Sequence, residues 1–287
     1  MKRTTWIAAT TLGLGVALSG CSGAEPHAAG PAPLTKAEQS KLDAAVTDYE
    51  SWVKSELDTL VTKTEEFTTA IKAGDDDAAR AIYPEARSHW ERVETIASEF
   101  GDLDPAIDAR EAGLANGEPW TGWHRLEKDL WPGRAKNYTR LDMGERTKLA
   151  EKLLRDTETI HEQSHDLALT ATDIVEGAQG LLEEVAGEKV TGEEEYWSRT
   201  DLWDFQANLD GAVKGYEEIE DVVRGRDAAL AANLDRQFAD VQELLDAQRA
   251  GAGFVTYDKL SKDEIKAMST AVDALGESLA ELSKVIG

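Results

Sequence analysis

Apolar residues recur at steps of three and four along most of this 287-residue chain, and this period constrains its fold more than any other feature. The clearest run begins after Thr35 and Glu38, which form a capping-box pattern, and it ends at Gly74. Its apolar positions are Leu42, Val46, Tyr49, Val53, Leu57, Leu60 and Val61. Such a repeat places one apolar stripe along a helix, so the sequence predicts a long helix between the capping box and Gly74.

The same period predicts further helices along the rest of the chain. A second helix begins near Asp75 and continues to Phe100, and Pro84 is expected to bend or restart it. The other predicted helices cover residues 120–131, 143–168, 173–186, 200–222, 225–249 and 262–285. GFVTYD is interpreted as a loop, and no stretch has a strand pattern. The sequence therefore predicts an all-α fold of two antiparallel four-helix-bundle-like lobes, about 35–170 and 171–287.

The first twenty residues have the composition of a secretion signal. Lys2 and Arg3 precede the apolar stretch WIAATTLGLGVAL, which is shorter than the roughly 20 residues of a membrane-spanning helix. The stretch leads into Leu18-Ser19-Gly20-Cys21, which resembles a bacterial lipobox. We therefore expect a lipoprotein signal peptide at 1–20, lipidation of Cys21, a flexible tether at 21–34 and a membrane-anchored protein outside the cytoplasm. The alternative is an ordinary signal peptide beside an incidental cysteine.

Cysteine usage and charge limit the chemistry open to the chain. Cys21 is its only cysteine, so disulfides and thiolate metal sites are excluded if that residue is lipidated. The formal net charge is −25, and removal of Lys2 and Arg3 with the signal peptide would make it −27. A field of this sign repels nucleic acid and attracts cations. Any bound metal must then be held by histidine, carboxylates, backbone or water.

The segment WTGWHRLEKDLW places His124 and Glu127 three residues apart in a short predicted helix between two long connections. Residues at this spacing share one face of a helix, so both side chains can reach one metal ion. Connections of that length are usually functional or disordered, and their apolar residues argue against disorder. An ordinary surface pair is the alternative.

Other carboxylates gather upstream of that segment. Glu91 and Glu94 are also three residues apart, beside the apolar stripe of the second helix, and GDLDPAIDAR supplies Asp102, Asp104 and Asp108. One imidazole with several carboxylates suits ferrous iron, manganese or zinc, and suits copper(I) poorly. The alternative is that Glu91 and Glu94 face water, as charged pairs on helices usually do.

A second histidine motif is HEQSH, His161 to His165, which matches the H-E-x-x-H pattern of zinc peptidases. In that reading the histidines bind zinc and Glu162 acts as general base. The apolar stripe of the predicted helix leaves both histidines at its edge, and no third ligand follows at a familiar spacing. A solvated helix edge is therefore the favoured interpretation, with a metallopeptidase as the alternative.

Three segments carry a family resemblance: YPEARSHWERVETIASEFGDLDPAIDAREA, WTGWHRLEKDLW and VTGEEEYWSRTDLWDFQANLDGA. They resemble the EfeO/EfeM proteins of the imelysin-like family, and residues 122–127 match its G-x-H-x-x-E motif. The resemblance extends from about residue 36 to the C-terminus and implies two helical lobes with a metal site in the cleft between them. The site residues that it implies are His124, Glu127, Glu91, Glu94 and Asp108. Asp201 and Asp204 match a further family segment, either as metal contacts or as residues that hold the lobes together.

The same resemblance implies a function in iron uptake rather than catalysis. A protein of this type binds iron, ferrous or ferric, outside the membrane and delivers it to an EfeU-type permease, with an EfeB-type haem peroxidase as an associate. Zinc or another divalent metal is an expected substitute in vitro. Many EfeO proteins also carry an N-terminal cupredoxin domain, for which we expect no room between Cys21 and Thr35. Besides the metallopeptidase, a polysaccharide-binding module and a helical lipoprotein without ligand are the alternatives.

Overall fold

The fold begins with a long helix. The computed structural model describes residues 32–187 and 189–287, and its first helix, α1, spans Lys36–Ala73. Thr35 Oγ1 accepts the backbone N–H of Glu38, and the Glu38 carboxylate accepts the N–H of Thr35. Gly74 follows the helix at a φ of 72°. The predicted capping box and the predicted end are both confirmed, because both depend on local sequence alone.

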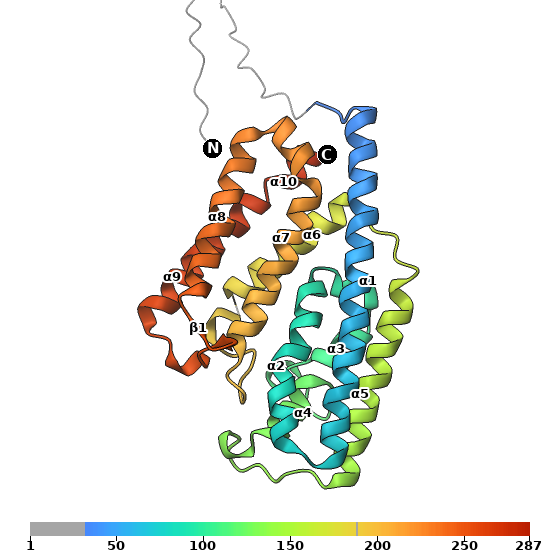
Figure 1. Cartoon of the computed structure of the whole chain (residues 1–287), viewed down its shortest axis with the longest axis vertical. Helices are drawn as coiled ribbons and strands as arrows, with labels where there is room; N and C mark the ends of the chain where they lie inside the picture. The colour runs from blue at the N-terminus through green and yellow to red at the C-terminus, as the bar shows by residue number, and fades with distance from the viewer. Residues whose placement is uncertain (1–31, 188) are drawn as a thin grey trace, which may run out of the picture. The chain divides into compact units, whose positions relative to one another are not determined.

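Helices α2 (Asp76–Val93) and α5 (Met143–Ser164) pack beside α1 (Figure 1). Their buried apolar side chains form one cluster with those of α1, and it includes the mutually contacting rings of Phe67, Tyr83 and Trp123. Burial of an aromatic or large aliphatic side chain contributes roughly 1.5–3 kcal/mol. The cluster therefore fixes the start of the short helix to which Trp123 belongs.

The second half of the chain supplies the remaining long helices. They are α6 (Ala171–Gly187), α7 (Asp201–Arg226), α8 (Ala228–Asp246), α9 (Lys262–Leu279) and the short α10 (Leu282–Ile286). Their buried residues form a second apolar cluster. α7 also packs against α2, and a Cβ at Gly211 would lie 2.2 Å from the carbonyl oxygen of Arg92. This close approach brings the middle of α7 next to the end of α2.

Short elements fill the connections between the long helices. Between α2 and α5 they are η1 (Glu94–Phe100), α3 (Leu103–Asp108), η2 (Glu111–Gly113), α4 (Trp123–Leu130) and η3 (Pro132–Arg134). A 3₁₀ turn, η4 (Lys189–Thr191), precedes α7. The two-residue strands β1 (Arg249–Ala250) and β2 (Gly253–Phe254) pair antiparallel after α8, and η5 (Tyr257–Lys259) follows them.

Several predicted boundaries are wrong for local reasons. α4 begins at Trp123 rather than at residue 120, because Gly122 has a φ of 87° that no α-helix contains. α2 ends at Val93 and tightens into a 3₁₀ helix, in which Ile96 departs from helical angles. Pro84 lies inside α2 without restarting it. The last predicted helix divides into α9 and α10, and the GF of GFVTYD forms β2 rather than loop.

The all-α fold class is confirmed. Pro33–Gly287 packs as one unit, and the division into two lobes at residue 170 stays a prediction. The predicted signal peptide, the lipidated Cys21 and most of the tether lie outside the described residues. Within residues 32–187 and 189–287, none of the helices has the length and apolarity that a membrane span requires.

Candidate metal site

Gly122 determines where α4 starts and what it faces. Its φ of 87° favours glycine, and a Cβ there would lie 2.0 Å from the carbonyl oxygen of Ile107, at the end of α3. Thr121 Oγ1 also donates to the carbonyl oxygen of Ala106 at 2.6 Å. The backbone before α4 therefore lies directly against α3. This contact brings His124, two residues after the glycine, next to Asp108, one residue after Ile107.

His124 is 1% exposed and is surrounded by carboxylates. Its Nε2 atom lies 3.3 Å from Glu194 Oε1 and 3.4 Å from Asp108 Oδ1, and its Nδ1 atom lies 3.4 Å from Glu127 Oε2. The Nε2 atom has no partner in hydrogen-bond geometry. A buried, unsatisfied ring nitrogen beside two carboxylate oxygens is the arrangement that a metal ion completes.

Glu127, the other residue of the predicted pair, is held by backbone. Its Oε1 atom accepts the N–H of Trp197 at 2.7 Å and the N–H of Ser198 at 2.6 Å. Its Oε2 atom faces His124 Nδ1. Glu127 thus joins α4 to the segment before α7 and leaves one oxygen toward the imidazole.

Asp108 is held in place by two buried side chains of α2. Its Oδ1 atom pairs with the guanidinium of Arg87, and its Oδ2 atom accepts the indole N–H of Trp90 at 2.8 Å. Burial opposes ionisation here, but the Arg87 guanidinium holds the pKa of Asp108 well below its usual range. Asp108 is therefore a carboxylate, with one oxygen shared between Arg87 and His124.

Two site residues that the sequence reasoning missed are Glu194 and Glu195, in the segment between η4 and α7. Glu195 accepts Ser198 Oγ at 2.6 Å and Tyr83 Oη at 3.1 Å, and it lies 2.6 Å from Arg87 Nε. Glu194 faces the Nε2 side of His124. The only sequence signal for them is the run of three glutamates in GEEEYW.

Glu91 and Glu94 lie at the end of α2 and the start of η1, and both contact a buried lysine. Lys189 Nζ lies 2.9 Å from Glu91 Oε2 and 2.5 Å from Glu94 Oε2. Asn208 Nδ2, from α7, donates to the same two oxygens at 3.0 Å each. One oxygen each from Glu91, Glu94 and Asp108 lies within 4.8 Å of the others. All five predicted site residues therefore lie in one region, with Glu91 and Glu94 beside Lys189 rather than beside His124.

Buried acidic groups outnumber buried cations in this region. The carboxylate cluster consists of Glu91, Glu94, Asp108, Glu127, Glu194, Glu195 and Asp204. Five of these side chains belong to residues at most 4% exposed, and the buried basic residues among them are Arg87, Lys189 and His124. Burial and the nearby Glu127 raise the pKa of Glu195 well above its usual range. Burial and Arg87 lower the pKa of His124, but three neighbouring carboxylates outweigh them and hold it well above its usual range.

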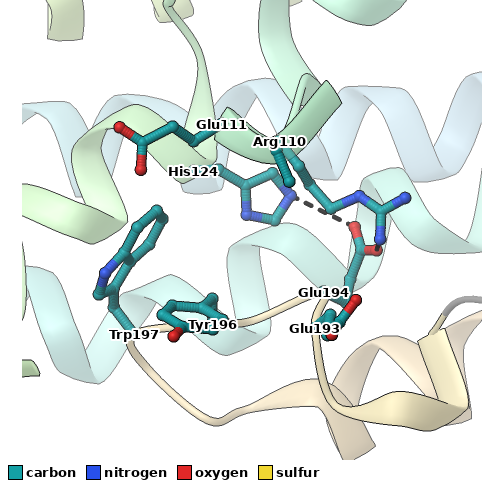
Figure 2. Close-up of a pocket in the computed structure, with 8 residues that line it drawn as sticks. Arg110, Glu111, His124, Glu193, Glu194, Tyr196 and Trp197 are labelled. Atoms are coloured by element: carbon teal, nitrogen blue, oxygen red, sulfur yellow. Dashed lines mark ion pairs between the residues drawn. The ribbon is translucent and has the colours of Figure 1, made fainter. Parts of the chain in front are cut away.

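A pocket of about 350 Å³ opens onto His124 and Glu194 (Figure 2). Arg110 lies on one side of it, 3.3 Å from Glu194 Oε2, and the side chains of Tyr196 and Trp197 lie on another. In Figure 2 the Nε2 side of the imidazole is directed at Glu194. Nε2 is therefore the ring nitrogen of His124 that faces an ion entering from solvent.

The remaining acidic candidates have other positions. Asp102 is exposed. Asp104 is partly buried, and its burial and the nearby Asp108 raise its pKa to about 6. Asp201 accepts the backbone N–H of Glu195 at 3.1 Å, and Asp204 Oδ1 lies 3.7 Å from Arg87 Nε. Asp201 therefore holds the glutamate segment, and Asp204 is part of the carboxylate cluster.

The HEQSH motif lies at the helix edge, as its favoured interpretation expects. His161 Nε2 pairs with Asp58 of α1 at 2.8 Å, and its ring meets the ring of His165 edge to face. Glu162 and His165 are exposed, and α5 ends at Ser164. Among the described residues, the groups of side chains spaced to hold a metal ion do not include this motif.

Comparisons with known proteins agree with one another. The family model for imelysin, peptidase M75, matches residues 45–282. An Efem/EfeO family lipoprotein of Staphylococcus haemolyticus is 38% identical over 250 residues, which are 86% of this chain and 85% of that protein. The iron uptake system component EfeO of Escherichia coli is 41% identical over 86% of this chain, and the match spans 64% of the longer relative.

A solved structure shows the same fold. It is the crystal structure from Parabacteroides distasonis of a protein named as an iron-regulated protein A precursor, with a TM-score of 0.63 and 15% identity. The match covers 88% of this chain and 96% of that one. At this identity the likeness concerns the arrangement of helices alone.

Proposed function

The chain belongs to the imelysin family, and from this premise we propose that it is an extracytoplasmic iron-binding protein that captures iron and delivers it to a membrane permease. Its relatives include proteins named as iron uptake system components and as a lipoprotein. Both names fit a non-enzymatic carrier that Cys21 anchors to the membrane. An EfeU-type permease as the recipient and an EfeB-type haem peroxidase as an associate belong to the same proposal.

The observation that carries the proposal is the charge of the carboxylate cluster. Its acidic groups outnumber the three buried basic side chains Arg87, Lys189 and His124, and most of the carboxylates are themselves buried. Uncompensated negative charge in such a region has a large desolvation cost, which nearby cations offset. A divalent or trivalent ion supplies the missing positive charge in a volume smaller than that of any side chain.

The ligands that we propose are His124 Nε2, Asp108 and Glu194. One atom from each lies within 4.8 Å of the other two, and the group borders the pocket. Ligand atoms bind transition metals at about 2.0–2.2 Å, so an ion between them draws the side chains together by small rotations. The pocket leaves coordination positions for water, which suits a cargo that must later be released.

Glu127 has a supporting role in this arrangement. The two backbone N–H groups occupy its Oε1 atom, and its Oε2 atom faces the imidazole on the side away from the pocket. A ligating histidine usually donates its second ring N–H to a carboxylate, which fixes the tautomer and the ring orientation. The alternative group, His124 with Glu127 and Glu195, lies on that enclosed side and would use Nδ1 as the ligand.

A titration of the purified metal-free protein with ferrous iron under anoxia, and separately with zinc, tests these roles. We expect His124→Ala and Glu194→Gln to abolish tight binding, and Glu127→Gln to weaken it about 10–100-fold, as loss of a supporting carboxylate does. His165→Ala removes an exposed imidazole from the HEQSH motif and is the matched control. Unchanged affinity in His124→Ala would refute the proposed site. Abolition by Glu127→Gln with full binding in Glu194→Gln would favour the Nδ1 group instead.

Delivery and anchoring need measurements in cells. A strain that lacks the protein is expected to accumulate less iron from a low-iron medium, and His124→Ala is expected not to restore it. Cys21→Ser is expected to move the protein from the membrane fraction to the soluble fraction. Restoration of uptake by His124→Ala would separate the uptake function from this metal site.

A further inference from the structure

Lys189 lies where lysine is rarely found, fully enclosed at the start of a short 3₁₀ turn. Lys189 is 2% exposed, and its ammonium group contacts Glu91 and Glu94 at hydrogen-bond distance. Those two carboxylates, together with Asp108, form a group with the spacing of a metal site. We propose that Lys189 is a tethered cation that occupies the Glu91–Glu94 pair and keeps a second metal ion out of the carboxylate cluster. This inference rests on the proposed function.

The carboxylate pair is pre-arranged for a small cation. Asn208 donates to Glu91 Oε2 and Glu94 Oε2 at 3.0 Å each, and also to the carbonyl oxygen of Glu91 at 2.9 Å. The ammonium group lies against the same two oxygens. Asn208 belongs to α7 rather than to the turn that contains Lys189, so we expect both acceptors to keep these hydrogen bonds if the ammonium group is removed.

Solvent cations can approach this pair from its Glu94 side, because Glu94 borders a pocket whereas Glu91 is fully buried. A pocket of about 330 Å³ borders Glu94 and Asp108 and is also lined by Asp104, Glu184 and Glu194. An acidic entrance raises the local concentration of cations. An acidic route would load the pair with metal unless another cation already occupied it. Arg87 pairs with Oε1 of Glu91, and the cation between the Oε2 atoms of Glu91 and Glu94 is Lys189.

The two candidate metal groups share Asp108, which lies near His124 on one side and belongs to the Glu91–Glu94 group on the other. If both groups were loaded, Asp108 would stand between the two ions, as bridging ligands do in two-metal sites. Such a pair would hold iron more firmly and would favour redox chemistry over release. A lysine in one position limits the load to a single exchangeable ion.

Stoichiometry measured by metal analysis after gel filtration tests the proposal. We expect the number of tightly bound ferrous or zinc ions to rise from about one to about two per chain in Lys189→Met, since two-metal sites form when bridging carboxylates are available. Lys189→Arg keeps the charge and is expected to bind one ion. Lys189→Met combined with Glu94→Gln is expected to return to one ion. Lys152→Met removes a remote lysine, paired with Asp156 on α5, and controls for overall charge.

The outcomes separate this inference from the proposed function. A folded Lys189→Met protein that still binds one ion overturns the inference and leaves the His124 site intact. A second ion in Lys189→Arg also overturns it, because exclusion by charge would then be wrong. Wild type without any bound ion, beside one ion in Lys189→Met, refutes the His124 site and supports the tethered cation.

The folding of the variant is itself a readout. If Lys189→Met folds only when metal is added, the metal has replaced the ammonium group and the proposal is supported. Circular dichroism against metal concentration measures this. If the variant stays unfolded at every metal concentration, a metal ion cannot take the position of the ammonium group and the proposal is overturned.

Discussion

Replacement of Gly122 by alanine tests whether the contact between α3 and α4 builds the site. The residue has φ 87° and ψ −165°, a region that essentially only glycine populates, and a side chain there costs about 1–3 kcal/mol. The added Cβ would also lie 2.0 Å from the carbonyl oxygen of Ile107, so the backbones must separate. Overpacking of this kind costs about a further 1–3 kcal/mol. Together, about 2–6 kcal/mol is a large share of a typical unfolding free energy of about 5–15 kcal/mol.

Gly117→Ala is the matched control. Gly117 has a similar φ of 85°, but a Cβ there meets nothing within 4 Å. The control therefore carries backbone strain without the collision. Urea unfolding of metal-free protein, followed by far-ultraviolet circular dichroism, gives both free energies of unfolding. We expect Gly122→Ala to be less stable than Gly117→Ala by about 1–3 kcal/mol, the overpacking contribution.

The same variants connect the contact to metal binding. His124 Nε2 lies 3.4 Å from Asp108 Oδ1, and separation of α4 from α3 would move these two atoms apart. Metal affinity should therefore fall in Gly122→Ala and stay unchanged in Gly117→Ala. If the two variants agree within about 0.5 kcal/mol in stability, the range of ordinary surface substitutions, and bind metal equally, the packing argument is refuted.

Three further predictions concern charge and the second histidine motif. The pKa of His124 is raised in the metal-free fold, so the imidazole stays protonated there. Its protonation stabilises the fold fully below about pH 6.5, the ordinary pKa of histidine in the unfolded chain. This stabilisation is lost as the pH rises through the pKa of His124 in the folded protein. Metal must displace the proton, so its affinity and the rise in Tm that it causes should be larger near pH 8 than near pH 6, and a pH-independent shift in thermal unfolding would contradict this. Arg87→Met leaves the carboxylates uncompensated and should cost about 3–5 kcal/mol in metal-free urea unfolding, with partial recovery when metal is added. Glu162→Gln should leave zinc binding unchanged when the metal-free protein is titrated with zinc. If the wild type cleaves peptides in a zinc-dependent manner and Glu162→Gln does not, the peptidase alternative is restored.

Local sequence predicted the elements whose ends depend on nearby residues. α1 follows from its apolar repeat, from the Thr35–Glu38 capping box and from Gly74. The start of α4 was placed too early because the apolar and aromatic pattern extends back to Trp120. What ends the pattern is a positive φ at Gly122, and that angle follows from contact with Ile107, fifteen residues earlier. A periodicity argument contains no information about such a contact.

The site could be predicted where its residues share a helix face, and not where the tertiary fold brings them in. The His124–Glu127 and Glu91–Glu94 spacings were visible in the sequence. Glu194 reaches His124 only because the segment before α7 docks on Glu127 through the N–H groups of residues 197 and 198. That segment has no periodic signal.

The buried cations were missed because arginine and lysine are usually exposed. Arg87 and Lys189 are buried only because the carboxylates around them are buried too. Each group on its own looks like an ordinary surface residue in the sequence. The prediction of either therefore requires the prediction of the whole cluster.

Under the proposed function, Arg87 and Lys189 also explain how an iron carrier can fold before it binds iron. A small zinc domain gains its folding free energy from the metal and stays unfolded without it. Here Arg87 and Lys189 offset part of the negative charge in the metal-free state, so we expect the protein to fold without iron. The same cations reduce the net charge that attracts the metal and therefore lower its affinity. Under the proposed function the protein must release iron to a permease, so weaker and reversible binding is the expected outcome. The same two buried cations would then both stabilise the metal-free fold and favour release of the ion.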